Sequence, residues 1–321
     1  MKINVSVIIC TYNSEYRIIK TLEYLKLQKT NLLFEVIVVN NNCTDNSITK
    51  ALDYWNLTQS INPLIILEEK NQGLSFARKT GVLEASGEVI IFCDDDNSFC
   101  CNYLDYCYNY LTNNMNIGAM CSSIIPKSNI KLPIWFSTYQ RYYACGVFSL
   151  NSGDVTDNGW IWGAGLAMRR SVISGLYASG FNNLANGRNK KVLSSGEDVE
   201  LCKWIILCGY KLWYDENIYL IHNIPDERLT KEYVVKLNSD NKSKKLNYSY
   251  DLIIAIRNNR FIETLFRFLL YTYKNGITRS SLDNLGIFIS ALLFKIGIKR
   301  NDFYNNIIIY SNYYASNFFK K

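Results

Sequence analysis

Three adjacent aspartates, Asp94, Asp95 and Asp96, follow directly on an apolar run at residues 88–93. The run is rich in β-branched and aromatic residues, which is typical of a buried strand. Three neighbouring carboxylates repel one another unless positive charge lies beside them. A divalent cation that carries a diphosphate is the natural counter-charge, because hard cations take oxygen ligands and bridge phosphate oxygens. A plain acidic surface turn has the same composition, so the rest of the chain has to decide between the two.

The elements that would position this triplet form a repeating pattern in the first half of the chain. Apolar runs predict buried strands at residues 5–10, 35–39, 63–67 and 88–93. Helical spacing of apolar residues fills the segments between them, and we expect these helices to begin after Ser14, Asp45 and Gly73. Repeated β-α-β units imply a largely parallel sheet that binds its ligand at the carboxyl ends of its strands. The predicted fold class is therefore α/β.

Polar clusters stand at three of these predicted strand ends, at residues 11–13, 40–45 and 94–96. Each cluster alone has the composition of an ordinary surface loop. The carboxyl ends of parallel strands meet at one edge of a sheet, so the three clusters are expected to converge there. Their convergence favours a nucleotide site.

The second half of the chain is less regular. Residues 160–168 combine β-prone residues with central glycines, which predicts a strand with a bulge or with a ligand close to its backbone. Asp198 is predicted to open a helix, and residues 218–221 are predicted to form a short strand that ends at His222, the only histidine of the chain.

Composition narrows the class of protein. With 48% hydrophobic and 20% charged residues, the 321-residue chain is expected to be globular. Its first residues lead into a strand-like run without a long apolar segment, so we expect no signal peptide. The ten cysteines lack paired C-x-x-C spacing, which argues against a zinc site or a disulfide framework and predicts reduced thiols, most of them buried.

Net positive charge is concentrated in the last quarter of the chain. Residues 241–321 hold 13 Lys and Arg against 4 Asp and Glu, whereas residues 1–240 hold 22 against 24. The same stretch is rich in Phe, Tyr and Ile. Its longest uninterrupted apolar piece, residues 285–294, is far shorter than the roughly 20 residues that a spanning helix needs. We therefore expect helices that lie on an anionic membrane surface. Helices packed on the preceding domain are the alternative.

Taken together, these segments resemble the family 2 glycosyltransferases of GT-A fold. The resemblance covers residues 4–235 and rests on short motifs in family order. These are VIICTYN at residues 7–13, VVNNNCTD at 38–45, NQGLSFARKTG at 71–81, DDD at 94–96, GAG at 163–165 and GED at 196–198. The resemblance implies a GT-A fold, which is a Rossmann-like, mostly parallel sheet with flanking helices, and inverting transfer of a sugar from a nucleotide-sugar.

The resemblance also assigns residues to the nucleotide. Thr11, Tyr12 and Asn13 would line it, and Arg78 would reach the base or phosphate region unless it faces solvent on its helix. The family usually has aspartate where this chain has Asn40, where the side chain accepts the N3–H of uracil. An asparagine carbonyl can accept the same bond, so the site stays workable while the identity of the base is less certain.

At the acidic strand end, the resemblance implies that Asp94 touches the ribose, with Asp95 beside it, and that Asp96 binds Mn²⁺ or Mg²⁺. His222 follows at a position where many GT-A enzymes place a histidine that binds the metal or the diphosphate. Arg228 fits a diphosphate contact from a closing loop and fits a surface ion pair equally well.

Asp198 is the candidate general base. Inverting transfer needs a carboxylate that takes the proton of the acceptor hydroxyl while its oxygen attacks the anomeric carbon. Two alternatives remain open from the sequence: Glu197 is the base, or Asp198 only caps its helix.

These inferences give one set of expectations. Residues 1–235 form the GT-A domain, with a nucleotide-binding half at 1–114 and an acceptor half at 115–235, and residues 236–321 form a basic, aromatic-rich helical tail. We expect a metal-dependent inverting enzyme that uses a nucleotide-sugar, probed first as a UDP-sugar, and a glycan or lipid-linked acceptor in surface polysaccharide synthesis. It would be cytoplasmic and peripheral on the inner face of the membrane, with no nucleic-acid partner. The competing hypotheses are a sugar-nucleotide-binding protein without turnover and a sugar-nucleotidyltransferase. The latter is disfavoured because residues 11–15 lack a Gly-rich basic loop.

Overall fold

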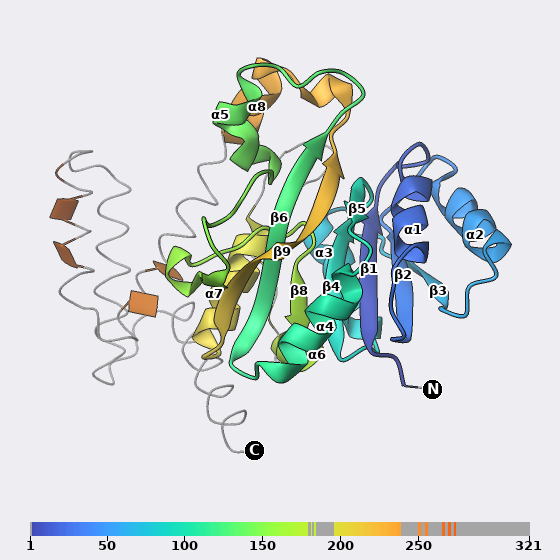
Figure 1. Ribbon diagram of the computed structural model, residues 1–321, viewed down its shortest axis with the longest axis horizontal. Helices are drawn as coiled ribbons and strands as arrows, with labels where there is room; N and C mark the ends of the chain where they lie inside the picture. Colours follow the sequence, from blue (N-terminus) through green and yellow to red (C-terminus); the bar gives the residue numbers. More distant parts are fainter. Residues whose placement is uncertain are drawn as a thin grey trace.

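The structure is a computed structural model that describes residues 2–178, 181, 183, 196–238, 250–251, 254–255, 265–266, 269–270 and 273. Within these residues nine strands form one sheet in the order β3-β2-β1-β4-β8-β6-β9-β5, and β7 pairs with β9 (Figure 1). The strands are β1 (Val5–Thr11), β2 (Phe34–Asn40), β3 (Leu64–Glu68), β4 (Val89–Asp94), β5 (Asn97–Phe99), β6 (Ile117–Lys127), β7 (Gly153–Asp154), β8 (Ala167–Arg169) and β9 (Lys211–Asn223). The α-helices are α1 (Ile18–Lys26), α2 (Ser47–Leu57), α3 (Leu74–Glu84), α4 (Tyr103–Asn113), α5 (Phe136–Tyr139), α6 (Arg170–Ala178), α7 (Glu197–Leu207) and α8 (Lys231–Asn238). The short 3₁₀ turns are η1 (Gln140–Tyr143), η2 (Thr156–Asn158) and η3 (Asp226–Arg228).

The first four strands of the sheet order run parallel. β1 lies between β2 and β4, and β3 pairs on the outer side of β2. β1, β2 and β4 are rich in Val and Ile and are buried along almost their whole length, as strands covered by helices on both faces must be. Beyond β4 the pairing is mixed, because β8 runs antiparallel to β4 and to β6. The prediction of an α/β fold with a large, mostly parallel sheet and flanking helices is confirmed.

Helices cover both faces of the sheet. In Figure 1, α1 and α4 lie in front of the strands, and α3, α6 and α7 lie behind them. β6 and β9 pair over most of their length and extend upward beyond the other strands, where they lead into α5 and α8. The two predicted halves, 1–114 and 115–235, therefore share one sheet, and the predicted domain boundary at 235 falls within α8.

Three local predictions are wrong. Residues 218–221 are not a separate short strand but part of the 13-residue β9, which ends at Asn223. Ser14 does not cap α1, because a turn comes first and the helix begins at Ile18 with Arg17 as its N-cap. The carbonyl of Ser14 instead accepts the N–H groups of Arg17 and Ile18 at 2.8 and 3.0 Å. Residues 160–168 form a strand only from Ala167 onward, because Gly165 has φ +69° and turns the backbone away from an extended path.

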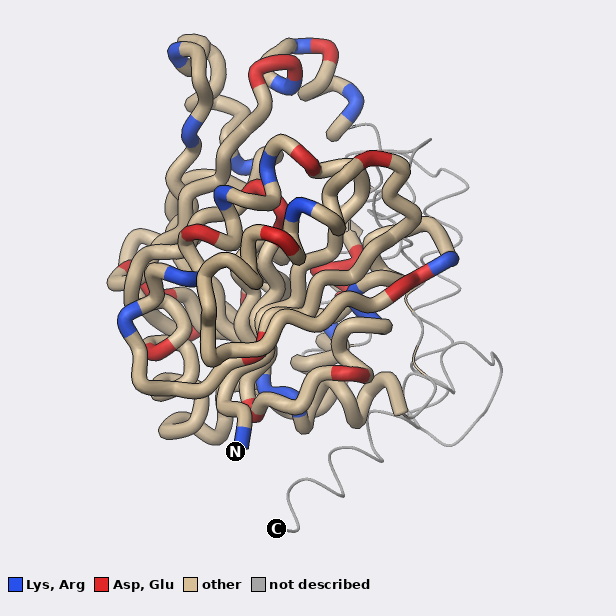
Figure 2. The backbone as a smooth tube through the Cα atoms, turned by 90° about the vertical axis from the view of Figure 1, so that its right-hand side faces the viewer, with Lys and Arg blue, Asp and Glu red and all other residues tan. Residues whose placement is uncertain are grey.

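The predicted tail at 236–321 falls mostly outside the described residues. In the described part, basic and acidic residues are interspersed along the chain (Figure 2). This agrees with the sequence of residues 1–240, in which 22 Lys and Arg nearly balance 24 Asp and Glu. No helix in the described part is long and apolar enough to cross a membrane.

Candidate active site

A cavity of about 400 Å³ opens at the carboxyl ends of β1 and β4. Strand register brings the polar clusters together there, since Cys10 of β1 pairs with Asp94 of β4 and Thr11 pairs with Asn40 of β2. Eight of the ten predicted site residues line this cavity: Thr11, Tyr12, Arg78, Asp94, Asp95, Asp96, Asp198 and His222. Asn13 and Asn40 do not line it.

Arg78 connects the end of β4 to the start of α7. Its guanidinium is buried against the ring of Phe92, with Cζ 4.6 Å from the ring centroid. Nη1 lies 3.3 Å from Glu197 Oε1 and Nη2 lies 3.6 Å from Asp94 Oδ1. Burial by itself lowers the pKa of Arg78, but Glu197, Asp94 and Asp198 outweigh it and raise that pKa above its ordinary value. Arg78 is therefore a fixed cation beside Asp94 and does not face solvent.

Asp95 ties β1 to the turn before α1. Arg17 donates to its Oδ1 from Nε at 3.3 Å and from Nη2 at 3.1 Å, and Thr11 donates to its Oδ2 at 3.1 Å. Burial raises the pKa of Asp95 to about 6, Arg17 opposes the shift, and the charges of Asp96 and Asp94 add to it. Both carboxylate oxygens of Asp95 accept hydrogen bonds from protein side chains, which favours a role for Asp95 in holding the cavity wall together.

Asp96 meets two cationic side chains. Antiparallel pairing of β5 with β9 sets Asn97 opposite His222, which places the imidazole next to Asp96. His222 Nε2 lies 3.5 Å and Arg228 Nη1 3.4 Å from Asp96 Oδ2. Burial alone would raise the pKa of Asp96, but His222 and Arg228 hold it well below its usual range. Burial would lower the pKa of His222, and the charge and hydrogen bond of Asp96 instead raise it well above 6.5.

The Asp96–His222 pair fits a divalent cation that takes the place of the proton on His222 Nε2, because a histidine binds metal as a neutral imidazole. His222 Nδ1 lies 2.9 Å from the carbonyl oxygen of Tyr143, which can only accept, so Nδ1 carries a proton and Nε2 faces Asp96. Metal-binding histidines are usually oriented by such a second hydrogen bond. The described residues contain no group of three or more His, Cys, Asp and Glu side chains that could hold a metal. Asp96 and His222 would thus supply two ligands, and diphosphate oxygens and water the others, as Mg²⁺ and Mn²⁺ accept.

Asp198 also lines the cavity, from the first turn of α7. The backbone N–H of Gly163 donates to its Oδ2 at 3.0 Å, and that of Val199 donates to its Oδ1 at 2.8 Å. Gly163 has to be glycine, because a Cβ there would lie 2.9 Å from Asp198 Oδ2 and 3.0 Å from Arg78 Nη1. Glu197, the alternative base, is buried in its ion pair with Arg78, whereas Asp198 is half-buried.

The two predicted residues outside the cavity have protein partners. Asn13, at φ +51°, accepts the Thr44 N–H at 2.8 Å and so joins the loops after β1 and β2. Asn40 donates from Nδ2 to both carboxylate oxygens of Glu68 at 3.0 and 2.9 Å, and its Oδ1 accepts the Cys43 N–H at 2.8 Å. The side-chain carbonyl of Asn40, which was expected to accept a hydrogen bond from the nucleobase, thus already accepts one from Cys43.

The sequence did not single out several residues of the cavity wall. Arg17 and Tyr143 come from a turn and from η1, and neither segment carries a motif. Asn41 was only one member of a polar cluster. Its side chain accepts the Gly73 N–H at 2.8 Å and donates to the carbonyls of Glu69 and Asn71, which fixes the loop before α3.

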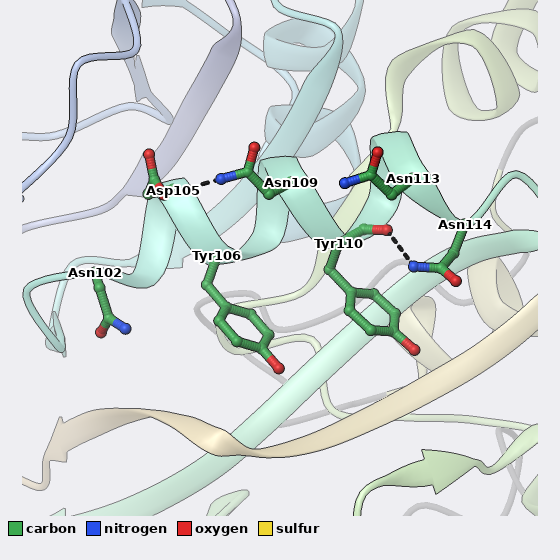
Figure 3. Close-up of a pocket in the computed structure, with 7 residues that line it drawn as sticks. All are labelled: Asn102, Asp105, Tyr106, Asn109, Tyr110, Asn113 and Asn114. Atoms are coloured by element: carbon green, nitrogen blue, oxygen red, sulfur yellow. Dashed lines mark hydrogen bonds between the residues drawn. The ribbon is translucent and has the colours of Figure 1, made fainter.

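A separate concavity of about 320 Å³ lies along α4 (Figure 3). It is lined by Asn102, Asp105, Tyr106, Asn109, Tyr110, Asn113 and Asn114. Some of its amides are satisfied locally, since Asn109 donates to Asp105 at 2.9 Å and Asn114 donates to the Tyr110 carbonyl at 2.8 Å. It holds neither a cation nor a pair of carboxylates, so the chemistry described above belongs to the cavity at the strand ends.

A parallel sheet with a polar cavity at the carboxyl ends of its strands defines a nucleotide-binding α/β protein. The chain belongs to glycosyl transferase family 2, whose family model matches residues 6–176.

Known proteins similar to this chain agree with that family. A cholesterol galactosyltransferase of Borreliella burgdorferi is 35% identical over 111 residues, which are 34% of this chain and 29% of that protein. The chain covers a third or less of the length of the first relatives that it matches, between 20% and 33%. Among solved structures, S. aureus TarS 1-349 in complex with UDP-GlcNAc superposes with a TM-score of 0.58 at 17% identity over 99% of this chain and 92% of that one. GalNAc-T7 with UDP, GalNAc and Mn²⁺ gives 0.54 at 14% identity over 79% and 51%. At these identities the structural likeness concerns the fold.

Proposed function

We propose that this protein is a metal-dependent inverting glycosyltransferase that moves a sugar from a nucleotide-sugar to a hydroxyl of a glycan or lipid-linked acceptor. The observation that carries the proposal is one cavity that is lined both by the Asp96–His222 pair and by the half-buried carboxylate of Asp198. UDP is the first nucleotide to test, because the TarS structure holds UDP-GlcNAc and the GalNAc-T7 structure holds UDP with Mn²⁺. Surface polysaccharide synthesis at the inner face of the membrane is the setting we propose.

The residues of the cavity would share the reaction as follows. Asp198 takes the proton from the acceptor hydroxyl. The acceptor oxygen bonds to the anomeric carbon from the face opposite the diphosphate, the bond from that carbon to the diphosphate oxygen breaks, and the leaving diphosphate keeps the electron pair. Arg228 and Arg78 are fixed cations near the position of that developing charge. A metal bound by Asp96 and His222 would neutralise charge on the diphosphate.

An assay of UDP release tests the proposal. The full chain is incubated with UDP-GlcNAc, UDP-glucose and UDP-galactose in Mn²⁺, in Mg²⁺ and in excess chelator. We expect release of UDP from at least one donor in the presence of metal and none in chelator. Tight binding of these donors without any turnover, with or without candidate acceptors, would instead identify a sugar-nucleotide-binding protein.

A calorimetric titration of UDP tests the metal site separately. We expect UDP to bind the wild-type chain more tightly with Mn²⁺ than in chelator, and Asp96→Ala to abolish that difference. Asp53→Ala is the matched control, because Asp53 is exposed on α2 and remote from the cavity wall. Equal affinity of the wild-type chain for UDP in Mn²⁺ and in chelator would overturn the metal assignment.

A further inference from the structure

A second cavity of about 400 Å³ lies on the far side of Asp198. It shares Asp198 and Ala144 with the first cavity, and its other walls come from η1, from residues 158–162 and from α7. Asp198 is thus the one carboxylate of the two cavities that borders both. A general base for transfer has to stand in this position, with the sugar donor on one side and the attacking hydroxyl on the other.

Aromatic side chains form one wall of this second cavity. Trp160 is half-buried and Trp162 is buried, and both pack edge-on against Phe148 with ring centroids 5.1 Å apart. Tyr142, 44% exposed, stands at the rim. The indole N–H of Trp162 has no hydrogen-bond partner among the described residues. A buried donor without a partner beside a cavity is a candidate ligand contact.

Two residues from the C-terminal part of the described chain also line the cavity. Leu237 of α8 and Asp251 both line the cavity, and Asp251 pairs with the buried amine of Lys203 on α7. Gly159, at φ +76°, leaves the space that this amine occupies, because a Cβ there would collide with it. This ion pair gives the cavity a polar stretch beside Gly159, and its two charges neutralise each other.

We propose that this second cavity binds the acceptor as a saccharide, with a sugar ring against Trp160 and the reacting hydroxyl at Asp198. The proposal rests on the proposed function of the neighbouring cavity. A pyranose ring has one face of C–H groups that suits an aromatic wall and a rim of hydroxyls that suits polar side chains. The cavity has this combination, and its volume is within the range of about 300–1,000 Å³ usual for small-molecule sites. In the transfer step the hydroxyl proton goes to Asp198 as its oxygen bonds to the anomeric carbon of the donor.

The test separates binding of the acceptor from binding of the donor. The probes are octyl glycosides of glucose, galactose and N-acetylglucosamine, offered to the full chain with the donor that the UDP-release assay identifies. Trp160→Ala and the rim variant Tyr142→Ala are compared with Trp213→Ala, which removes an equally half-buried tryptophan outside both cavities. Binding of each glycoside in the presence of UDP is also measured by saturation-transfer NMR, which needs no turnover.

We expect both cavity variants to raise the acceptor KM by about tenfold, the scale of one aromatic contact. Their affinity for UDP and their hydrolysis of the donor in water should match the wild-type chain, which also shows that they are folded. Unchanged acceptor KM in both variants, or no contact of any glycoside with the UDP-bound chain, would overturn the acceptor site. A wild-type chain that neither hydrolyses nor transfers from any donor, while still binding a glycoside at Trp160, would overturn the proposed function and leave the saccharide site standing.

Discussion

Asp198 differs from the other carboxylates of the site in its hydrogen-bond and ion-pair partners. Asp95 and Asp96 lie against arginine or histidine side chains, and Glu197 is buried against Arg78. Asp198 accepts hydrogen bonds from backbone N–H groups, which hold its orientation without a full countercharge at each oxygen. Asp198 is also only half-buried, so its carboxylate is open to the cavity, which supports Asp198 over Glu197 as the base.

Asp198→Asn should lower kcat by about 10²-fold or more, the usual scale for a general base. Donor affinity should stay nearly unchanged, because the base acts on the acceptor. Steady-state kinetics and a UDP titration measure the two quantities, with the exposed Asp53→Asn on α2 as control. A collapse of donor binding together with the rate would make Asp198 a donor ligand or a structural residue.

Gly163→Ala tests how the base is held. The new Cβ would lie 2.9 Å from both Cβ and Oδ2 of Asp198, so the carboxylate or its helix has to shift. We expect kcat to fall by about tenfold to 10²-fold, because a shift of about 1 Å in a reacting group costs on that scale. Gly153→Ala is the control, since a Cβ there meets no atom within 4 Å. Wild-type kcat in Gly163→Ala would show that Asp198 is not positioned by this backbone contact.

Residues at strand ends could be predicted because hydrophobic periodicity shows where a strand stops. Thr11 and Asp94 are the last residues of β1 and β4, and both line the cavity as the pattern implied. Arg17 and Tyr143 could not be predicted, because they reach the cavity through packing of segments that are distant in sequence. Asn40 is a third case: its position at the end of β2 was predicted, but its contact with Glu68 depends on the pairing of β2 with β3.

At the scale of elements, α7 links the catalytic cavity to the C-terminal segment. Its first turn carries Asp198 and Glu200, and a later turn carries Trp204; Glu200 and Trp204 both bond to Tyr250. The Tyr250 hydroxyl donates to Glu200 Oε1 at 2.7 Å and accepts from Trp204 Nε1 at 3.1 Å, with all three side chains buried. Tyr250 and Asp251 therefore hold the helix that carries the proposed base.

Tyr250→Phe should destabilise the protein by about 1–3 kcal/mol, because Glu200 and Trp204 each lose a buried partner. Thermal unfolding should show a lower Tm, and kcat should fall more than the donor affinity as α7 loosens. The exposed Tyr219→Phe, at 42% exposure, is the control and should leave Tm unchanged. A wild-type Tm for Tyr250→Phe would mean that this contact does not stabilise α7.

The secondary-structure elements that were predicted well are those whose apolar residues follow one clear pattern. Continuous apolar runs gave β1, β2 and β4 within one residue at each end. The segment 160–168 failed because its aromatic and small residues suit a strand while Gly165 adopts φ +69° and places the preceding residues in the cavity walls. Aromatic and small residues can form a strand or line a cavity, and no local sequence pattern distinguishes the two.

At the scale of the whole molecule, charge is divided unevenly along the chain. Residues 1–240 are nearly balanced, whereas residues 241–321 carry a surplus of nine positive charges from 13 Lys and Arg against 4 Asp and Glu. Reaction at an acceptor embedded in a membrane requires the catalytic cavity to stay near the lipid surface. We propose that residues 241–321, which are basic and interleaved with Phe and Tyr, supply both the electrostatic and the apolar contact for this.

The full chain should therefore sediment with vesicles that contain anionic lipid and should be released by salt. Each Lys or Arg close to the surface contributes up to about 1 kcal/mol, and the attraction is screened within a Debye length. Replacing Lys242, Lys244 and Lys245 by Glu should weaken sedimentation at low salt. The same exchange at the exposed Lys26, Lys29 and Lys131 should not, although it changes net charge equally. Two outcomes would contradict this prediction: a wild-type chain that stays in the supernatant at low salt, or equal loss of binding in both triple variants. Either would show that the last quarter of the chain does not direct membrane binding. An acceptor in solution would then serve the site equally well.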